Sequence, residues 1–387
     1  DLLEQPLSEK DLTGAVKSLK GGKSPGTDGF TANFYKFFWI DIKILVLNSL
    51  QYAFKNNLLS EEQRRAILRL IPKHGKDLTY LKHWRPISLL NTDYKILAQA
   101  LALRLQKVLP EIISPDQNAY ITGRFIGVNI RTIIDSIVFS SEKKRNTSLA
   151  FLDFEKAFDK IRWDFLDNCL LHFDFGPNFR KWITIMYTDI FSAVINNGYT
   201  TPFFKLHCGI RQGCPMSALI FILSVETLSR TIKHNRHIKG IKVKSHEIKI
   251  TQLADDTTLI LKDITSLQTA LNVLYLFQAA SGLKLNYAKT EILQLGNVTY
   301  SKSNPFNLKW VKDRVYALGT WFYKDLDQII QENYKAKFEI FVSILKQWQI
   351  RKLTLFGKIT VLKSLAMSKL NYCIATLETP EWFTEQV

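Results

Sequence analysis

Hydrophobic and polar positions follow two periods along this chain, and together they predict a mixture of helices and strands. Apolar side chains recur at helical spacing in stretches that we expect to form helices, at 8–19, 94–109, 155–171, 179–190 and 266–280. Short β-rich apolar runs predict strands at 66–72, 149–154, 248–254 and 257–261. A helix that opens at Pro215 and ends near Gly240, and a helical C-terminal region, complete an α+β pattern.

Turn residues join several of these elements into hairpins. The pair Asn197-Gly198 interrupts the alternating run 194–206 and is a strong two-residue turn signal. A polar turn would fold the strand at 66–72 back onto the segment that begins at Trp84.

Three aspartates stand at the ends of predicted strands. Asp255-Asp256 separates two apolar runs, so we expect both carboxylates at the tip of a hairpin. Asp153 lies where the strand at 149–154 passes directly into a helix. Taken alone, such residues are more often a surface turn and a helix cap.

Three carboxylates at neighbouring strand ends can also hold two divalent cations on either side of a reacting phosphorus. Without cations, each carboxylate pair at ~4 Å would repel by about 4 kcal/mol. Hard oxygen ligands combined with a phosphate substrate favour two Mg²⁺ ions, for which Mn²⁺ could substitute. We therefore expect Asp153, Asp255 and Asp256 to be both catalytic residues and metal ligands.

The charge of the chain points to a polyanionic partner. Lys and Arg number 52 against 35 Asp and Glu, a formal net charge of +17, which favours nucleic acid first and an anionic membrane surface second. No apolar run approaches the roughly 18 residues of a membrane span, and the first residues lack the pattern of a secretory signal. Four scattered cysteines are typical of a reducing compartment. We expect an intracellular protein with no membrane partner.

Six short motifs occur in order along the chain. The first two are GKSPGTDGF (22–30) and LKHWRPISLLN (81–91). The other four are FLDFEKAFD (151–159), GIRQGCPMSALIF (209–221), LADD (253–256) and SGLKLNYAKTEI (281–292). In this order they resemble the fingers motifs and motifs A, B, C and D of reverse transcriptases of non-LTR, LINE-type retrotransposons. A bare ADD is unspecific, whereas six ordered motifs within residues 8–375 are specific.

The resemblance implies a right-hand polymerase in which an antiparallel palm sheet packs on helices. The N-terminal segment and fingers would span 1–148, the palm 149–310, a primer-grip hairpin 311–325 and the thumb 326–387. It also implies an RNA-directed DNA polymerase that transfers nucleotides from dNTPs to a DNA primer on an RNA template. Such an enzyme would work in a cytoplasmic ribonucleoprotein and in the nucleus.

By the same resemblance, five residues would bind the incoming dNTP. Lys73 and Arg85 match the fingers cations that grip the triphosphate, and two solvated basic side chains are the alternative. Phe158 falls where the family carries a steric gate against a ribose 2′-hydroxyl, and a core aromatic is the alternative. Gln212 and Gly213 resemble the motif B elements that line the pocket, where glycine allows close backbone approach.

Motif D and the hairpin that follows would act on the leaving group and the primer. Lys289 resembles the lysine that protonates the departing pyrophosphate, and a mobile surface lysine is the alternative. The segment YALGTWF resembles the primer grip, which we expect as a short hairpin near 316–322. There, backbone contacts at Leu318 and Gly319 would support the primer terminus.

Three further cations are candidates for contacts with primer or template phosphates. Arg211 lies beside Gln212 and could reach a phosphate. Lys358 and Lys369 share one flank of a predicted thumb helix, although basic faces are often only solvated. The inward side of that helix would carry an apolar stripe, made of Ile359, Leu362, Ala366 and Leu370. Tracking a duplex in this way needs no base contacts.

Two positions depart from the family pattern. Leu253 precedes the acidic pair where an aromatic is common, and Ala218 stands where a second proline is frequent. Neither change should abolish the chemistry. We find no endonuclease-like region before residue 1 and no Cys/His knuckle after Val387, so we expect a fragment of a larger polyprotein.

Two other functions fit part of the pattern. A viral-type RNA-dependent RNA polymerase shares the right-hand architecture but usually has an acid where Phe158 stands. A domesticated, noncatalytic nucleic-acid-binding protein would keep a basic channel without turnover. The intact aspartates argue against the second.

Overall fold

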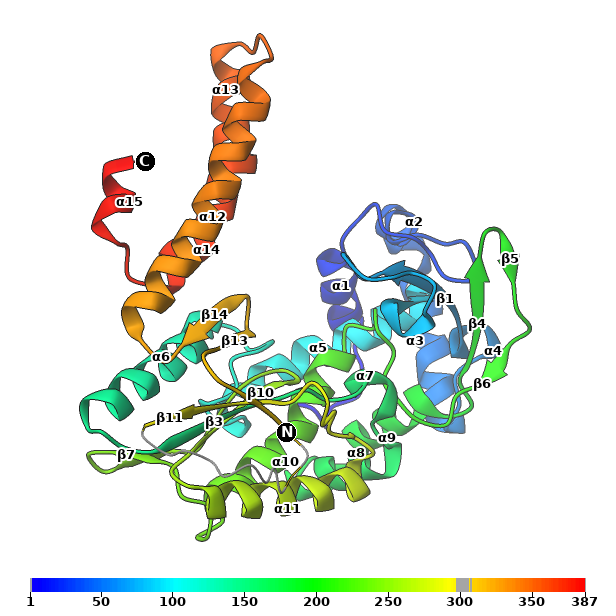
Figure 1. Ribbon diagram of the computed structural model, residues 1–387. Coiled ribbons are helices and arrows are strands. Elements are labelled where there is room, and N and C mark those ends of the chain that lie inside the picture. The colour runs from blue at the N-terminus through cyan, green and yellow to red at the C-terminus, as the bar shows by residue number, and fades with distance from the viewer. Residues whose placement is uncertain (1, 297–305, 307, 387) are drawn as a thin grey trace.

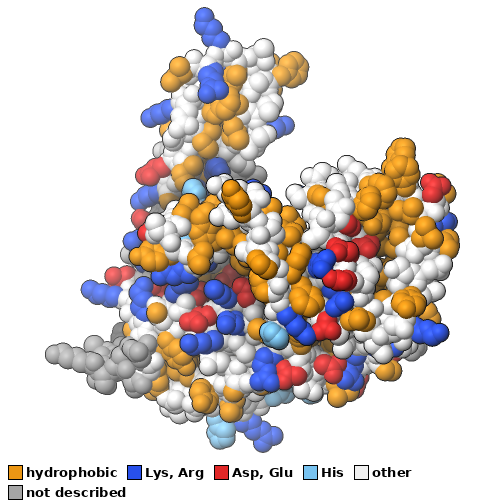
Figure 2. Space-filling model, turned by 90° about the vertical axis from the view of Figure 1, so that its right-hand side faces the viewer, with side chains coloured by type: hydrophobic (Ala, Val, Ile, Leu, Met, Phe, Trp, Pro, Cys, Tyr) orange, Lys and Arg blue, Asp and Glu red, His pale blue; other side chains and the backbone are white. Residues whose placement is uncertain are grey.

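The computed structural model describes residues 2–296, 306 and 308–386. A central body carries two projections, one a lobe at the N-terminal side of the chain and the other a column of C-terminal helices (Figure 1). Figure 2 shows the column standing clear of the body. We call these parts the palm, the finger lobe and the thumb column. Residues 297–305 of the predicted palm lie outside the described residues.

The palm is built on a five-stranded sheet in the order β12-β11-β3-β10-β9. Neighbouring strands are antiparallel except β11 and β12, which run parallel. The strands are β3 (Thr147–Leu152), β9 (Ile250–Leu253), β10 (Asp256–Leu261), β11 (Glu291–Leu295) and β12 (Lys309–Val311). The antiparallel sheet expected from the sequence is confirmed, with one parallel edge strand in addition.

Both faces of this sheet are covered, which is why every residue of β3 is buried. Successive side chains of a strand point to opposite faces. Ala150 and Leu152 pack into a core with all the palm helices except α6, and Leu149 and Phe151 pack into a second core with α6 and the thumb column. The helices of the palm are α6 (Ile126–Glu142), α7 (Ala157–Lys160), α8 (Trp163–His172), α9 (Pro177–Tyr187), α10 (Ser217–His234) and α11 (Ile264–Ser281).

The single helix expected at 155–171 is wrong, because α7 and α8 are separate. Between them, the carbonyl of Ile161 accepts the backbone N–H of Gly209 at 2.7 Å. The backbone N–H of Arg162 donates to the carbonyl of Ser281 at 2.9 Å. These long-range hydrogen bonds replace the helical ones, so the chain turns at this point.

The finger lobe contains a second sheet in the order β2-β1-β4-β5, with β6 paired to β4. Its strands are β1 (Arg65–Pro72), β2 (Trp84–Leu90), β4 (Phe191–Asn196), β5 (Tyr199–Thr200) and β6 (Phe204–Lys205). The hairpin of β1 and β2 and the turn at Asn197-Gly198 are both confirmed. Asn197 and Gly198 adopt φ angles of 52° and 85°, as a type I′ turn requires.

Helices support the finger sheet and connect it to the palm. α1 begins after Ser8, within the helix predicted at 8–19, and the Ser-x-x-Asp sequence at 8–11 forms a capping box between Ser8 and Asp11. α5 runs three residues beyond the helix predicted at 94–109 and contains Pro110. The helical elements of this region are α1 (Glu9–Ser18), α2 (Ala32–Phe37), α3 (Trp39–Asn56), α4 (Glu61–Arg64), η1 (Leu81–His83) and α5 (Thr92–Ile112).

The thumb column follows the hairpin of β13 (Arg314–Ala317) and β14 (Thr320–Tyr323). Its helical elements are α12 (Leu326–Gln349), α13 (Leu355–Val361), the π-helical turn η2 (Leu362–Ala366), α14 (Met367–Thr376) and α15 (Glu381–Gln386). The predicted apolar stripe is half wrong: Ala366 and Leu370 are buried, whereas Ile359 and Leu362 are exposed. α13 lies at the far end of the column, away from the body (Figure 1).

A small hairpin, β7 (Ile241–Val243) and β8 (His246–Ile248), projects from the palm. Across the described part of the chain, no helix is both long and apolar enough to cross a bilayer.

Candidate active site

Asp153, Asp255 and Asp256 lie at one end of the palm sheet. Asp153 follows the last residue of β3, Asp256 begins β10, and the register of these antiparallel strands sets the two ends side by side. Asp255 occupies the two-residue turn between β9 and β10 together with Ala254. The predicted hairpin is confirmed, although Asp256 is a strand residue rather than a turn residue.

The surroundings of Asp255 and Asp256 disfavour their charged forms. Burial raises the pKa of the Asp256 carboxyl to about 6, and the charges of Asp255 and Asp153 add to this shift. Burial also raises the pKa of Asp255, with a contribution from the charge of Asp153. Asp256 is nevertheless exposed to solvent. The surrounding protein therefore reduces the hydration of its carboxylate without enclosing the side chain. A bound cation would offset the repulsion among these charges.

The cluster does not yet have the geometry of a metal site. No three His, Cys, Asp or Glu side chains in the described part of the chain are arranged to hold a metal ion. Oδ2 of Asp153 instead accepts a hydrogen bond from Nδ2 of Asn286 at 2.9 Å and lies 3.8 Å from Nζ of Lys289. The carboxylate oxygens and their negative charge suit a hard divalent cation. To bind such a cation, Asp153 would release its contacts with Asn286 and Lys289. The metal role stays a prediction.

The segment of motif D fixes the backbone of Asp153. The backbone N–H of Asn286 donates to the carbonyl of Asp153 at 2.8 Å. The backbone N–H of Asp153 donates to Oγ1 of Thr290 at 3.3 Å. Our reading of the sequence missed Asn286 and Thr290, although both lie within SGLKLNYAKTEI. The side chain of Lys289 is 68% exposed, and its proton-donor role stays a prediction.

Lys73 lies near Asp153 and near three other cations. Burial lowers the pKa of Lys73, and the positive charges of Lys289, Arg85 and Lys156 lower it further. Lys73 and Arg85 come from the arms of the β1–β2 hairpin, as the sequence predicted. Lys156 precedes α7 with a left-handed φ of 47° and was missed, although it belongs to FLDFEKAFD. The group is suited to a polyphosphate.

Phe158 and Gln212 lie close to motif A but have protein partners. The half-buried ring of Phe158 stacks on Phe221 with a centroid distance of 4.6 Å. Nε2 of Gln212 donates to Oδ1 of Asp159 at 3.2 Å, and burial raises the pKa of that carboxyl. Phe158 therefore makes the aromatic contact that a core residue would make. The dNTP-binding roles of Phe158 and Gln212 stay predictions.

Gly213 allows two backbones to approach each other closely. Its φ is 119°, and a Cβ atom at this position would lie 2.6 Å from the carbonyl oxygen of Ser88 in β2. The backbone N–H of Ser88 donates to the carbonyl of Gln212 at 2.7 Å. The close approach predicted for Gly213 is thus made to a finger strand, and its role in nucleotide binding stays a prediction.

Arg211 corrects one prediction. The residue is only 3% exposed, and Nη2 donates to the backbone carbonyls of Arg64 and Phe191. Its guanidinium lies 5.4 Å from the ring centroid of Tyr94. Arg211 therefore joins the last residue of α4 to the first residue of β4 inside the protein and cannot reach a phosphate of primer or template in this structure.

The predicted primer and template residues of the C-terminal part lie on the surface. Leu318 and Gly319 form the β13–β14 turn, with φ angles of 49° and 72°. The hydroxyl of Tyr372 in α14 donates to the carbonyl of Leu318, which fixes the turn against the thumb column. Lys358 and Lys369 are both exposed on the column. Their contacts with nucleic acid stay predictions.

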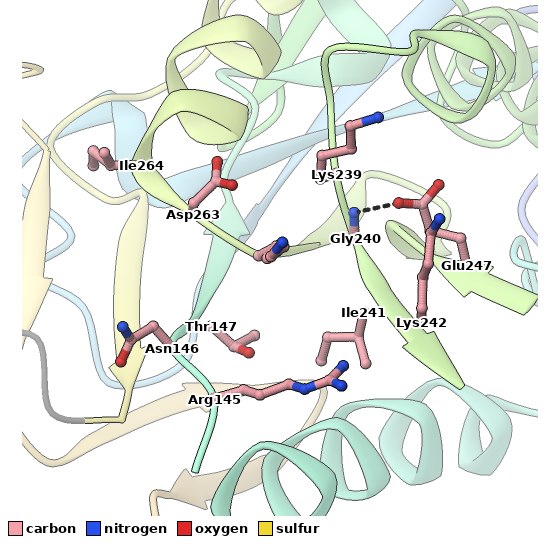
Figure 3. Close-up of a pocket in the computed structure, with 11 residues that line it drawn as sticks. Arg145, Asn146, Thr147, Lys239, Gly240, Ile241, Lys242, Glu247, Asp263 and Ile264 are labelled. Carbon is pink, nitrogen blue, oxygen red and sulfur yellow. Dashed lines mark hydrogen bonds between the residues drawn. The ribbon is translucent and has the colours of Figure 1, made fainter. Parts of the chain in front are cut away.

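One cavity of about 730 Å³ lies elsewhere on the palm, between β7 and the start of α11 (Figure 3). Gly240 lines it and donates its backbone N–H to Oε1 of Glu247 at 3.0 Å. None of the predicted site residues lines this cavity. The candidate site is therefore defined by the acids and cations rather than by this cavity.

Comparison with known proteins identifies a family and several relatives. The model of the family described as "Reverse transcriptase (RNA-dependent DNA polymerase)" matches residues 71–322. All of this chain aligns at 32% identity with 30% of the "Transposon TX1 uncharacterized 149 kDa protein" of Xenopus laevis. At 25% identity, 78% of the chain aligns with 42% of the "Retrovirus-related Pol polyprotein from type-1 retrotransposable element R2" of Popillia japonica. The chain thus spans less than half the length of either curated relative.

One solved structure supports the fold. It is the telomerase of Candida albicans in complex with the TWJ fragment of telomeric RNA, which matches with a TM-score of 0.52 and 11% identity. The match covers 92% of this chain and 65% of that chain. At this identity the likeness shows the right-hand fold alone.

Proposed function

The chain belongs to the reverse transcriptase family, and from this premise we propose that it is the RNA-directed DNA polymerase of a non-LTR retrotransposon. The observation that carries this proposal is the meeting of Asp153, Asp255 and Asp256 at one end of the palm sheet. Lys73 is close enough to Asp153 and to Arg85 for both charges to act on its pKa. The arrangement supports transfer of a nucleotide from a triphosphate.

The family uses divalent metal ions, and we propose two Mg²⁺ ions here, with Mn²⁺ as a substitute. When bound, these ions would stabilise charge on the attacking and leaving oxygens of the phosphoryl transfer. The three aspartates would supply the ligands. Lys73 and Arg85 would bind the triphosphate, and Lys289 would donate a proton to the departing pyrophosphate.

An RNA template, a DNA primer and dNTPs are the proposed partners and substrates. The net charge of +17 supports binding of a polyanion. The β13–β14 turn at Leu318 and Gly319 would support the primer strand. Lys358 and Lys369 on the thumb column would follow the phosphate backbone of the duplex, without reading its sequence.

The proposal is tested by extension of a DNA primer on an RNA template with dNTPs and Mg²⁺. Full-length cDNA is the expected product, and a mixture without divalent cation should give none. Binding of the duplex without any product would identify a noncatalytic nucleic-acid-binding protein. Extension with NTPs but not with dNTPs would identify an RNA-dependent RNA polymerase.

Replacing Phe158 with alanine tests the proposed sugar gate. The smaller side chain should make room for a 2′-hydroxyl, so incorporation of ribonucleotides relative to deoxynucleotides should rise by roughly 10- to 100-fold. The measurement is kcat/KM for a single NTP and for the matching dNTP on the same primer and template.

Phe165→Ala provides a matched control for the loss of a palm aromatic. Phe165 packs against Phe277 with a centroid distance of 5.6 Å, and no role in the site is proposed for it. This variant should keep the wild-type preference for dNTPs. Unchanged sugar discrimination in Phe158→Ala would refute the gate and leave the stacking on Phe221 as the role of this ring.

A further inference from the structure

The loop between α5 and α6, residues 113–125, supports the turn that carries Asp255. Oε1 of Gln117 accepts the backbone N–H of Ala254 at 2.9 Å and that of Ala119 at 3.0 Å. Nε2 of Gln117 donates to the carbonyl of Ala254 at 3.4 Å. Gln117 is 1% exposed, so its side chain reaches Ala254 from inside the protein.

Ala254 needs such support because of its backbone conformation. It is the first residue of the two-residue turn between β9 and β10, and its φ is 56°. Glycine is the residue that usually adopts a left-handed φ at this place in a hairpin turn. A single amide side chain that bonds both the N–H and the carbonyl of Ala254 fixes the orientation of the peptide units on either side of it. One of those units leads directly into Asp255.

The backbone of the loop is also joined to β9. Gln117 forms an isolated parallel bridge with Gln252. The N–H of Asn118 donates to the carbonyl of Gln252 at 3.0 Å, and the N–H of Gln252 donates to the carbonyl of Asp116 at 2.8 Å. Nη1 of Arg124 closes the loop by donating to the carbonyl of Gln117 at 2.7 Å. Gln117 is therefore held in place relative to the hairpin that it supports.

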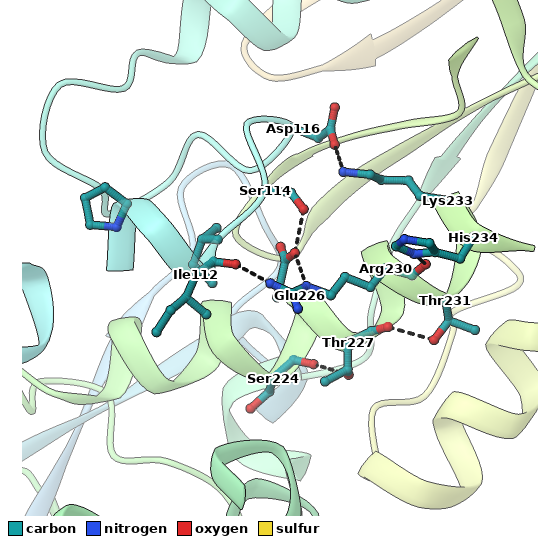
Figure 4. A network of polar contacts seen from close by, with 12 residues as sticks. Ile112, Ser114, Asp116, Ser224, Glu226, Thr227, Arg230, Thr231, Lys233 and His234 are labelled. Atoms are coloured by element: carbon teal, nitrogen blue, oxygen red, sulfur yellow. Dashed lines mark hydrogen bonds and ion pairs between the residues drawn. The ribbon is translucent and has the colours of Figure 1, made fainter. Parts of the chain in front are cut away.

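A polar network around the buried Glu226 anchors the start of this loop to α10 (Figure 4). Oε1 of Glu226, which is fully buried, accepts from Oγ of Ser114 at 2.5 Å and from Nε of Arg230 at 3.0 Å. Nζ of Lys233 forms an ion pair with Asp116 at 2.6 Å. Two side-chain links from one long helix thus fix the loop just before Gln117.

We propose that Gln117 is a positioning residue for the polymerase reaction, which sets the orientation of the Asp255 carboxylate through Ala254. This inference rests on the proposed function, because it concerns the same acids. Gln117 itself does not touch the substrate or the reacting atoms. Its loss should slow the chemical step, since a misplacement of about 1 Å at a reacting centre can cost roughly 10²-fold in rate.

The test is the extension of a DNA primer by one nucleotide on an RNA template, with the full chain and its variant Gln117→Met. Methionine has a similar length and removes both polar groups. We expect the maximal rate to fall about 10²-fold, with the KM for dNTP and the duplex affinity within about threefold of wild type. Rates are taken per active site from burst amplitudes, so that a partly unfolded sample does not imitate a slower step.

Two further variants separate positioning from a general loss of structure. Gln117→Glu keeps an acceptor for the N–H of Ala254 and should recover part of the rate lost in Gln117→Met. Gln268→Met removes an exposed glutamine of α11 and should behave as wild type. Backbone hydrogen exchange gives a readout without catalysis: the Ala254 amide should exchange roughly tenfold faster in Gln117→Met, as expected for the loss of about one hydrogen bond.

The outcomes distinguish the two proposals. A wild-type chain that binds duplex but extends no primer overturns the proposed function and this inference together. A wild-type chain that extends the primer, with Gln117→Met within threefold of its maximal rate, overturns only the role of Gln117. A higher KM for dNTP with an unchanged maximal rate also overturns it, since Gln117 would then act in substrate binding.

Discussion

Asp255→Asn is expected to lower the rate of primer extension by about 10³-fold or more, which corresponds to about 4 kcal/mol of lost transition-state stabilisation. Asparagine keeps the size of the side chain but removes the charge that would balance a cation in the reacting state. Binding of an RNA–DNA duplex should stay at the wild-type level, because the basic surface is unchanged. Extension rate and duplex affinity are measured on the same preparation.

The same substitution should not destabilise the fold. Burial raises the pKa of Asp255 above its usual range, so folding disfavours the charged form, and a neutral asparagine avoids that cost at neutral pH. Without divalent cations, the variant should unfold at the same temperature as wild type or at a higher one. This advantage should shrink as the pH falls towards the usual aspartate range, where wild type also becomes neutral.

Asp41→Asn is the control for Asp255→Asn. Asp41 is exposed in the first turn of α3, away from the palm sheet, and its replacement should leave extension unchanged. Wild-type extension by Asp255→Asn would exclude Asp255 from the reaction centre.

Gly213→Ala should lower the free energy of unfolding by about 2–4 kcal/mol and strongly reduce primer extension. A methyl group at this position would lie 2.6 Å from the carbonyl oxygen of Ser88, on a backbone with φ of 119°. The strain would separate motif B from β2 and weaken the hydrogen bond between Ser88 and Gln212. Denaturant unfolding and the KM for dNTP measure the two effects.

Gly198→Ala separates backbone strain from the steric clash. Gly198 also has a positive φ, 85°, but a Cβ atom there would meet no other atom within 4 Å. Its replacement should cost only about 1–2 kcal/mol and leave extension intact. Equal losses of stability in the two variants would show that the contact with Ser88 is unimportant.

Local patterns in the sequence determined much of the fold. The capping box at Ser8, the turn at Asn197-Gly198 and the apolar runs around Asp255 each encode a structure through neighbouring residues, so they could be predicted without knowledge of the fold. The order of the motifs likewise predicted that Asp153 lies in one site with Asp255 and Asp256. Their catalytic and metal roles await the experiments above.

Structural details that depend on contacts between distant parts of the chain could not be predicted in the same way. The segment 155–171 has the periodicity of one helix, yet backbone hydrogen bonds with Gly209 and Ser281 divide it. Arg211 adjoins the predicted dNTP residue Gln212, but its carbonyl partners, Arg64 at the end of α4 and Phe191 at the start of β4, lie elsewhere in the chain. An arginine has the same intrinsic chemistry in a core as on a surface, and only the packed structure decides which groups it meets.

For Asp255, the sequence determined the residue type, the hairpin and the neighbouring acid. The tertiary structure decided what supports the turn, because Gln117 lies far from Ala254 in sequence and meets it only when the 113–125 loop packs on β9. Asn286 reaches Asp153 in the same way, across a separation of 133 residues. Hydrophobic periodicity indicates which side of an element is buried. It does not indicate which polar side chain from another part of the chain will contact that side.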